Sequence, residues 1–371
     1  MNRLQALTQN GQAIWLDYIR RDLLDDGELA RLVAEDGVTG VTSNPAIFQQ
    51  AIGESDLYDA EIRRILDREP ETSTAELYER LAVEDIRRAA DVLRPVYDAT
   101  GGADGFVSLE VSPHLARDTA GTVAEARRFQ ARVDRPNLMI KVPATTEGIP
   151  AVETLLAEGI HVNITLMFSL AHYEAVARAY LRGVERAAAP ERAASVASFF
   201  VSRVDTEVDR QLDELGTEEA RALRGRIAIA NSKLTYERYR QIFEGEAFAG
   251  LRGRGARPQR VLWASTSTKD PSYRDVVYVE ELVGPNTVNT IPPATLEAFR
   301  DHGVAAESLT GGLDEARATL AELAAVGVDL DAVTEGLQEV GLEKFAGPFD
   351  RLIATLEAKK QSLLGVVAAG S

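Results

Sequence analysis

The sequence contains no cysteine, and this absence alone excludes several kinds of chemistry. Disulfide bonds, iron–sulfur clusters and thiol nucleophiles all require cysteine. The chain also has no apolar run that approaches 18 residues, and its N-terminus lacks the basic and then apolar pattern of a secretory signal. We therefore expect a cytoplasmic protein that does not enter a membrane.

Positive charge is in deficit as well. The 371 residues carry a formal net charge of −17. Nucleic acids and anionic membranes bind clustered lysine and arginine, so neither is an expected partner. An anionic substrate would have to be held by a local group of cations. Composition leaves the oligomeric state open.

Lysine is the scarcer of the two strongly basic residue types, with six lysines against 35 arginines. One of them, Lys141, lies inside the apolar run Leu138–Pro143. Arginine stays charged under all protein conditions, whereas a desolvated lysine can lose its proton. A neutral amine in a dry pocket is a nucleophile that forms a Schiff base with a carbonyl substrate. Lys141 therefore indicates covalent catalysis; the alternative is a lysine that only extends from a strand end to solvent.

Short apolar runs rich in β-branched residues alternate with longer amphipathic ones. This alternation predicts parallel strands joined by helices. The expected strands are Ala13–Ile19, Val38–Ser43, Gly105–Val111, Leu138–Pro143, His161–Met167, Ser195–Ser202, Arg260–Thr266 and Asn286–Ile291. Eight such units favour an α/β fold of the (β/α)8 TIM-barrel type, with a doubly wound sheet as the alternative.

Additional helices are expected around this barrel. Residues 54–98 read as a helical insertion of two helices with a break at Pro70–Thr72, and residues 316–362 read as C-terminal helices. The Gly- and Arg-rich stretch Gly245–Pro258 is expected to be a surface loop. Because no stretch resembles a linker, we expect residues 1–371 to form a single domain.

Polar side chains interrupt almost every expected strand near its C-terminal end. Burying polar groups inside a barrel costs folding free energy unless they line a site at the C-terminal ends of the strands. The interruptions are Asp17, Asn44, Ser108, Glu110, Lys141, Asn163, Thr165, Ser198, Ser202 and Arg203. The two-residue period of a strand places Glu110 with Ser108, and Thr165 with Asn163, on shared faces. Two acids and a lysine on inward faces form a proton-transfer constellation.

The motifs that contain these residues resemble those of transaldolase, the lysine-dependent aldolase-type transferase family of the pentose phosphate pathway. In chain order they are Thr42–Pro45, Ser108–Val111, Ile140–Thr145, Asn163–Ser169 and Ser198–Arg203. The resemblance runs from about Gln12 to Ala294. The length and the added helices resemble the longer bacterial branch of the family.

The resemblance implies four catalytic roles. Lys141 would form the Schiff base with the C2 carbonyl of a ketose. Glu110 would act as acid and base, through a water held by Thr165, while the imine forms and is hydrolysed. Asp17 would take the proton from the C4 hydroxyl and so trigger cleavage of the C3–C4 bond.

The resemblance also implies a set of substrate contacts. The matching positions are Asn44, Asn163, Ser198, Phe200, Arg203 and Lys269. The asparagines would bind the sugar hydroxyls and the carbanion, Phe200 would shape the pocket, and Arg203 would bind phosphate. Compact relatives place an arginine after the seventh strand, where this chain offers Lys269 or nearby hydroxyls.

No metal or other cofactor is expected, because an iminium stabilises the carbanion without a Lewis acid. The histidines His114, His161, His172 and His302 show no ligand spacing and are expected at the surface or in packing. The implied reaction moves a dihydroxyacetone unit from sedoheptulose 7-phosphate to glyceraldehyde 3-phosphate, giving erythrose 4-phosphate and fructose 6-phosphate. Two alternatives stay open: an aldolase that releases the unit by protonating the enamine, and a non-catalytic barrel that binds sugar phosphates. A doubly wound nucleotide-binding protein is disfavoured, because no Gly-x-Gly-x-x-Gly follows the first strand.

Overall fold

A computed structural model describes residues 2–369, and at its centre eight parallel strands form a closed ring. They are β1 (Gln12–Asp17), β2 (Val38–Thr42), β3 (Phe106–Glu110), β4 (Leu138–Pro143), β5 (Val162–Met167), β6 (Ser195–Phe200), β7 (Arg260–Ala264) and β8 (Thr287–Ile291). The strands follow one another in chain order, and β1 pairs with β8 to close the ring. The predicted TIM barrel is confirmed, and the doubly wound alternative is wrong, because such a sheet would leave two open edges.

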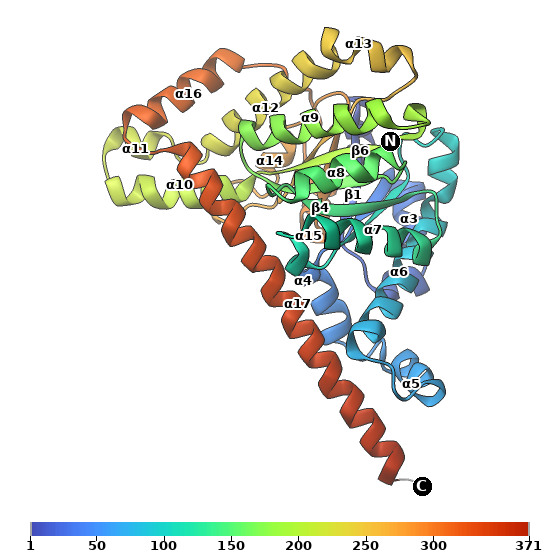
Figure 1. Ribbon diagram of the computed structural model, residues 1–371. Coiled ribbons are helices and arrows are strands. Elements are labelled where there is room, and N and C mark those ends of the chain that lie inside the picture. The colour runs from blue at the N-terminus through green and yellow to red at the C-terminus, as the bar shows by residue number, and fades with distance from the viewer. Residues whose placement is uncertain (1, 370–371) are drawn as a thin grey trace.

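Helices surround the ring of strands (Figure 1). Their bounds are α1 (Arg3–Gln9), α2 (Arg21–Asp25), α3 (Glu28–Arg31), α4 (Pro45–Phe48), α5 (Asp59–Arg68), α6 (Thr74–Ala99), α7 (Thr119–Val133), α8 (Gly148–Ala157), α9 (Leu170–Arg186), α10 (Ser202–Leu215), α11 (Glu218–Ala222), α12 (Ile227–Phe243), α13 (Glu246–Gly253), α14 (Val277–Glu280), α15 (Pro293–His302), α16 (Leu313–Ala325) and α17 (Leu330–Ala369). Short π-helical turns, η1 (Leu32–Asp36) and η2 (Gln49–Gly53), and 3-10 turns, η3 (Pro113–Leu115) and η4 (Pro190–Arg192), lie between them.

All eight predicted strands are present, and the differences lie at their ends. At the C-terminal ends the predictions extend two residues too far in β1, β6 and β7, and one residue too far in β2 and β3. Beyond β6, Ser202 already belongs to α10, and beyond β7, Ser265 adopts a left-handed φ of 57°. The expectation of a loop over Gly245–Pro258 is wrong, because it contains α13, which is fixed by the fully buried Phe248.

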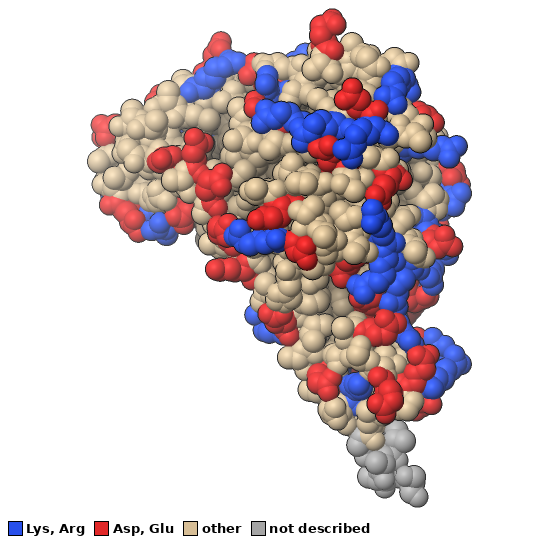
Figure 2. Space-filling view, viewed as in Figure 1, with Lys and Arg blue, Asp and Glu red and all other residues tan. Residues whose placement is uncertain are grey.

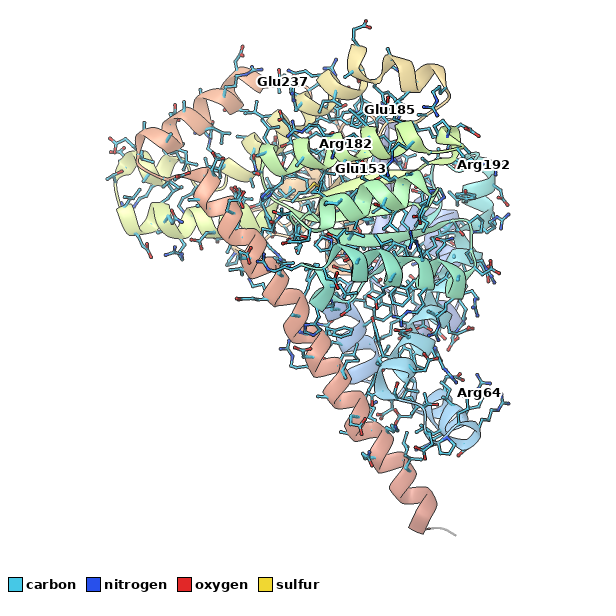
Figure 3. The ribbon with its side chains drawn as sticks, in the orientation of Figure 1. Arg64, Glu153, Arg182, Glu185, Arg192 and Glu237 are labelled. Carbon is cyan, nitrogen blue, oxygen red and sulfur yellow. The ribbon has the colours of Figure 1, made fainter. Side chains whose placement is uncertain are left out.

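Ion pairs of arginine with carboxylates join the helices of the outer layer. Glu153 of α8 lies 2.7 Å from Arg182 and 2.8 Å from Arg186, both on α9 (Figure 3). Figure 2 shows acidic and basic side chains interspersed over this face of the molecule. Exposed pairs of this kind each contribute little to stability. Arginine thus serves mainly as a surface cation here.

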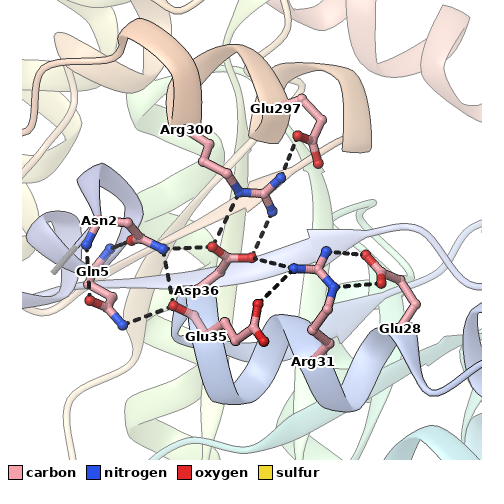
Figure 4. A network of polar contacts seen from close by, with 8 residues as sticks. All are labelled: Asn2, Gln5, Glu28, Arg31, Glu35, Asp36, Glu297 and Arg300. Atoms are coloured by element: carbon pink, nitrogen blue, oxygen red, sulfur yellow. Dashed lines mark hydrogen bonds and ion pairs between the residues drawn. The ribbon is translucent and has the colours of Figure 1, made fainter.

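A polar network around Asp36, which precedes β2, lies at the N-terminal end of the barrel (Figure 4). This nearly fully buried carboxylate accepts hydrogen bonds from Asn2 at 2.7 Å and from Arg300 at 2.7 and 3.2 Å. The network ties α1, η1 and α15 together below the strands. In TIM barrels this end serves stability, so the site must be sought at the other end.

The long helix α17 crosses the C-terminal end of the barrel and continues past it (Figure 1). Buried Gln338 fixes the crossing, because its side-chain amide donates to Ala144 O at 3.1 Å and to Leu166 O at 3.0 Å, at the ends of β4 and β5. Farther along the helix, Lys359 lies 3.0 Å from Asp59 of α5. No helix in the described part of the chain is long and apolar enough to span a bilayer.

Candidate active site

A cavity of about 170 Å³, here called the inner cavity, lies at the C-terminal ends of the strands. Of the predicted catalytic residues, Asp17, Lys141 and Thr165 line it. The predicted substrate contacts that line it are Asn44, Ser198, Phe200, Arg203 and Lys269. The other two predicted site residues do not line it: Asn163 is buried in the surrounding wall, and Glu110 lines an adjacent cavity of about 310 Å³, which shares Asn44 with the inner cavity.

Lys141 projects from β4 and its side chain is almost fully enclosed, with 5% of the residue exposed. Its Nζ donates a hydrogen bond to Ser43 O at 3.0 Å and lies 3.3 Å from Glu110 Oε2. The ring of Phe345, from α17, is centred 5.6 Å from Nζ. The strand register explains the pairing with the acid, because Glu110 of β3 lies opposite Lys141 of β4.

Two buried oxygens on the strands that flank β4 make no hydrogen bond to the described protein groups. They are Glu110 Oε2 on β3 and Thr165 Oγ1 on β5. Buried polar atoms usually find partners, so Thr165 Oγ1 is available to a ligand or water, whereas Glu110 Oε2 already has the Lys141 ammonium 3.3 Å away. Burial raises the pKa of Glu110 to about 7, although the charge of Lys141 acts in the opposite direction. A carboxyl group that titrates near neutrality can both give and take a proton.

The second acid, Asp17, reaches the cavity from β1. Its Oδ1 accepts a hydrogen bond from Thr42 Oγ1 at 2.7 Å. Burial raises its pKa, while the charge of Lys141 and the bond from Thr42 lower it. The two acids therefore come from different strands, and only Glu110 forms an ion pair with Lys141.

Asn163 lies on β5 between two serines. Its Nδ2 donates to Ser108 Oγ at 3.0 Å, and its Oδ1 accepts from Ser198 Oγ at 2.6 Å. These bonds join the inward faces of β3, β5 and β6, which the two-residue period predicted as polar. Asn44 is held by a different contact, since its Oδ1 caps α4 by accepting from Ile47 N at 3.0 Å.

A bulge interrupts the pairing of β5 next to Thr165. The pairing of β5 with β6 shifts between Ile164 and Met167, and Leu166 adopts a left-handed φ of 61°. Gly341 of α17 packs directly on this bulge, because a Cβ at that position would lie 2.9 Å from Leu166 Cδ2. With Gln338 bonded to the Leu166 carbonyl, α17 holds the bulge in place.

Cations occupy the opposite side of the inner cavity. Arg203, near the start of α10, lies with its guanidinium carbon 5.0 Å from the Phe200 ring centre, and its buried Nη1 has no hydrogen-bond partner among the described residues. Lys269 donates to Ser267 Oγ at 2.6 Å. Burial lowers the pKa of both cations, and the charge of Arg203 lowers the pKa of Lys269 further. Guanidinium and ammonium groups in this arrangement suit a phosphate.

Sequence reasoning missed the contribution of α17. Its buried face contains Thr334, Gln338, Gly341, Phe345, Leu352 and Leu356. That spacing predicts a buried helix face, and a glutamine within it was the available signal for a specific polar contact. Nothing in the local pattern indicates that Phe345 would reach the inner cavity.

The four histidines lie outside the inner cavity. His161 is buried and accepts a hydrogen bond from Ala194 N, and burial lowers its pKa to about 4. The others contact surface carboxylates: His114 with Asp350, His172 with Glu335, and His302 with Asp275. Within residues 2–369, no three His, Asp or Glu side chains are grouped in a way that could hold a metal ion.

Comparison with known proteins gives a consistent result. A family model described as Transaldolase/Fructose-6-phosphate aldolase matches residues 14–356. A Transaldolase from Frankia alni is 53% identical over 360 residues, covering 96% of each chain. A Transaldolase from Thiobacillus denitrificans is 51% identical and covers 96% of this chain and 100% of that protein, and one from Thermobifida fusca is 52% identical. The chain therefore belongs to the transaldolase/fructose-6-phosphate aldolase family.

Proposed function

We propose that the chain transfers a dihydroxyacetone unit from sedoheptulose 7-phosphate to glyceraldehyde 3-phosphate, with Lys141 as the Schiff-base nucleophile. The observation that carries the proposal is the position of its Nζ, on the wall of the inner cavity and 3.3 Å from a buried carboxyl group. The relatives named Transaldolase support the same reaction. The products are erythrose 4-phosphate and fructose 6-phosphate.

Imine formation begins when the unprotonated Lys141 amine attacks the C2 carbonyl and gives a carbinolamine. Glu110 donates a proton to the C2 hydroxyl, which leaves as water and yields the iminium. The raised pKa of Glu110, about 7, suits this transfer. Thr165 Oγ1 has no hydrogen-bond partner among the described residues and binds the water that carries the proton.

Carbon–carbon cleavage follows on the other side of the cavity. Asp17 removes the C4 hydroxyl proton, the C3–C4 bond breaks, and its electron pair moves to the iminium to form an enamine. Erythrose 4-phosphate leaves as the aldehyde. Burial raises the pKa of Asp17 and so strengthens it as a base. Thr42, bonded to Oδ1, fixes its orientation.

The second half reverses these steps on a new aldehyde. The enamine C3 attacks C1 of glyceraldehyde 3-phosphate, Asp17 returns its proton to the new C4 oxygen, and water hydrolyses the iminium with Glu110 as base. Lys141 is regenerated and fructose 6-phosphate leaves. No metal takes part in this scheme, and activity in excess EDTA stays a prediction.

Substrate binding divides among the remaining residues. Ser198 and Asn44 bind sugar hydroxyls, and Asn163, in the wall behind them, orients Ser198 by accepting the hydrogen bond from its Oγ at 2.6 Å. Arg203 and Lys269 bind the phosphate at the opposite side. This arrangement presents C2 of the ketose to Lys141 while the anionic end stays among cations.

A second candidate is release of the dihydroxyacetone unit to water, as in a fructose 6-phosphate aldolase. The description of the matching family model names both transaldolase and fructose-6-phosphate aldolase, so the aldolase activity is worth testing. Release requires protonation of the enamine C3 before an acceptor arrives. Free dihydroxyacetone accumulating from fructose 6-phosphate alone, at a rate matching transfer, would favour this candidate.

Reductive trapping tests the proposal. Borohydride added with fructose 6-phosphate should attach a dihydroxyacetone-derived mass to the peptide that contains Lys141. Peptide mass mapping distinguishes this site from Lys233 and Lys269. A label at either of those lysines, or none at all, contradicts the proposed mechanism.

A further inference from the structure

Half of the six lysines gather at the C-terminal end of the barrel. Lys141 and Lys269 line the inner cavity. Lys344, on α17, lines a second and larger cavity of about 760 Å³ between α10 and α17, here called the outer cavity. A chain that uses arginine for most surface cations has placed three of its lysines around two adjoining cavities.

The two cavities share their cationic wall. Arg203 and Lys269 line both the inner and the outer cavity, whereas Lys344 lines only the outer one. The charge of Lys344 lowers the pKa of Lys269, which agrees with their position around one cavity. Burial and the charge of Arg203 have larger effects on that pKa. Positive charge therefore continues outward from the phosphate-binding side of the inner cavity.

The position of Lys344 is fixed by its neighbours on α17. The next residue, Phe345, lines the inner cavity and is 5% exposed. Gln338 bonds to the carbonyls at the ends of β4 and β5. The backbone at residues 344–345 is thus held at the boundary of the two cavities, with one side chain lining each.

Lys344 is available to bind an anion. Among the residues that the structure describes, Lys344 alone of the six lysines makes neither a hydrogen bond nor an ion pair. The partners of the others are Glu110 and Ser43 for Lys141, Glu281 for Lys233, Ser267 for Lys269, Asp59 for Lys359 and the Thr72 carbonyl for Lys360. An ammonium group free of protein partners can engage phosphate without first breaking an ion pair.

Donor length determines how far the phosphate extends from Lys141. Once C2 is joined to Nζ, the phosphate sits on C6 of a six-carbon donor and on C7 of a seven-carbon donor. The additional carbon–carbon bond moves it outward by about 1.5 Å. Arg203 and Lys269 line both cavities and Lys344 lines only the outer one, so a phosphate on the two shared cations comes closer to Lys344 when it moves into the outer cavity.

We infer that Lys344 selects the seven-carbon donor by binding its phosphate in the outer cavity. This inference rests on the proposed function. The shorter donor keeps its phosphate on Arg203 and Lys269, and the longer donor adds the third cation. Lys344 is therefore a specificity-determining residue contributed by α17.

The test compares two donors in one set of variants. We measure kcat/KM for sedoheptulose 7-phosphate with glyceraldehyde 3-phosphate, and for fructose 6-phosphate with erythrose 4-phosphate. In Lys344→Gln the ratio of the first value to the second should fall about tenfold, the usual effect of losing one charged hydrogen bond. Lys344→Arg should restore the ratio, because the site requires only a cation.

Arg351→Gln is the matched control. It removes one positive charge from an exposed position of the same helix, and Arg351 lines neither cavity. The ratio should keep its wild-type value in this variant. Equal losses for both donors in Lys344→Gln, or the same ratio change in Arg351→Gln, would overturn the inference and leave the proposed function intact. If borohydride reduction with either donor does not label Lys141 in the wild-type protein, the proposed function and the inference about Lys344 are both wrong.

Discussion

The two sides of the inner cavity use lysine in opposite ways. On the β3–β5 side, Lys141 faces a buried carboxyl group 3.3 Å away. On the β6–β7 side, Lys269 lies beside Arg203 and its only described hydrogen bond is to a serine hydroxyl. An amine next to an acid can exchange protons, whereas an amine next to another cation favours an anion. In the proposed mechanism, one residue type thus serves chemistry on one side and binding on the other.

The largest expected effect comes from giving both lysines the same replacement. Lys141→Arg should abolish transfer, because a guanidinium cannot form an imine. Lys269→Arg should keep kcat/KM within about tenfold, because phosphate requires only a nearby cation. Coupled assays of fructose 6-phosphate formation measure both variants. Comparable losses in the two variants would show that both lysines serve the same purpose.

The next effect separates the two acids by reaction step. Glu110→Gln should slow borohydride trapping with any ketose donor. Asp17→Ala should still trap fructose 6-phosphate but should fail to release glyceraldehyde 3-phosphate. Loss of a positioned proton-transfer group costs on the order of 10²–10⁴-fold in rate. Single-turnover trapping and aldehyde release, measured on the same samples, report the two steps.

The paired variants control one another in that experiment. If both lose trapping and release to the same extent, the acids do not divide the steps, and the contrast between the two sides of the cavity is weaker than proposed. Thr42→Val gives a milder version of the Asp17 defect, because it removes the hydrogen bond to Oδ1 and leaves the carboxylate.

Burial of the Glu110 carboxyl group on the β3–β5 side also makes stability depend on pH. Burial raises the pKa of Glu110 from an ordinary value of 4.5 to about 7. Below pH 4.5 the carboxyl is protonated in both the folded and unfolded states, and its full contribution to stability is present. As the pH rises through 7 the folded state must give up a proton that the unfolded state has already lost, so stability falls.

The measurement is urea unfolding of wild type and Glu110→Gln at pH 5 and pH 8. Relative to wild type, the free energy of unfolding of the variant should rise by about 2 kcal/mol from pH 5 to pH 8. These two pH values span most of the interval between the unfolded and folded pKa values of Glu110. Glu343→Gln, at an exposed position of α17, removes a carboxylate without burial and should show no such trend. If wild type and Glu110→Gln differ in unfolding free energy by the same amount at pH 5 and pH 8, burial does not raise the pKa of Glu110.

Most of the barrel could be predicted because its signals are local. A two-residue period identifies an inward face, and parallel strands bring their C-terminal ends to one side. These two rules identified Lys141 and Glu110 as members of one site. The alternation also predicted the shared faces of Asn163 and Thr165, although not the bulge at Leu166.

The α17 contribution could not be predicted because it depends on packing between distant segments. Phe345 follows β4 by about 200 residues, and nothing in its own neighbourhood specifies the strand ends that it covers. The same limitation applies to Asn163, whose bonds to two serines come from strand neighbours and leave it in the wall rather than on the cavity surface. Helix docking is specified by side-chain fit across the whole interface.

The smallest expected effect concerns the cationic side. Arg203→Ala should lower kcat/KM for fructose 6-phosphate relative to unphosphorylated fructose by roughly 10- to 100-fold, because a guanidinium binds phosphate through two charged hydrogen bonds. Its Nη1, which has no hydrogen-bond partner within residues 2–369, is free for this contact. Arg203→Lys, which keeps the charge but loses the paired geometry, should fall between wild type and Arg203→Ala. If fructose and fructose 6-phosphate lose equally, Arg203 supports the fold or the chemistry through its contact with Phe200, and the phosphate binds elsewhere.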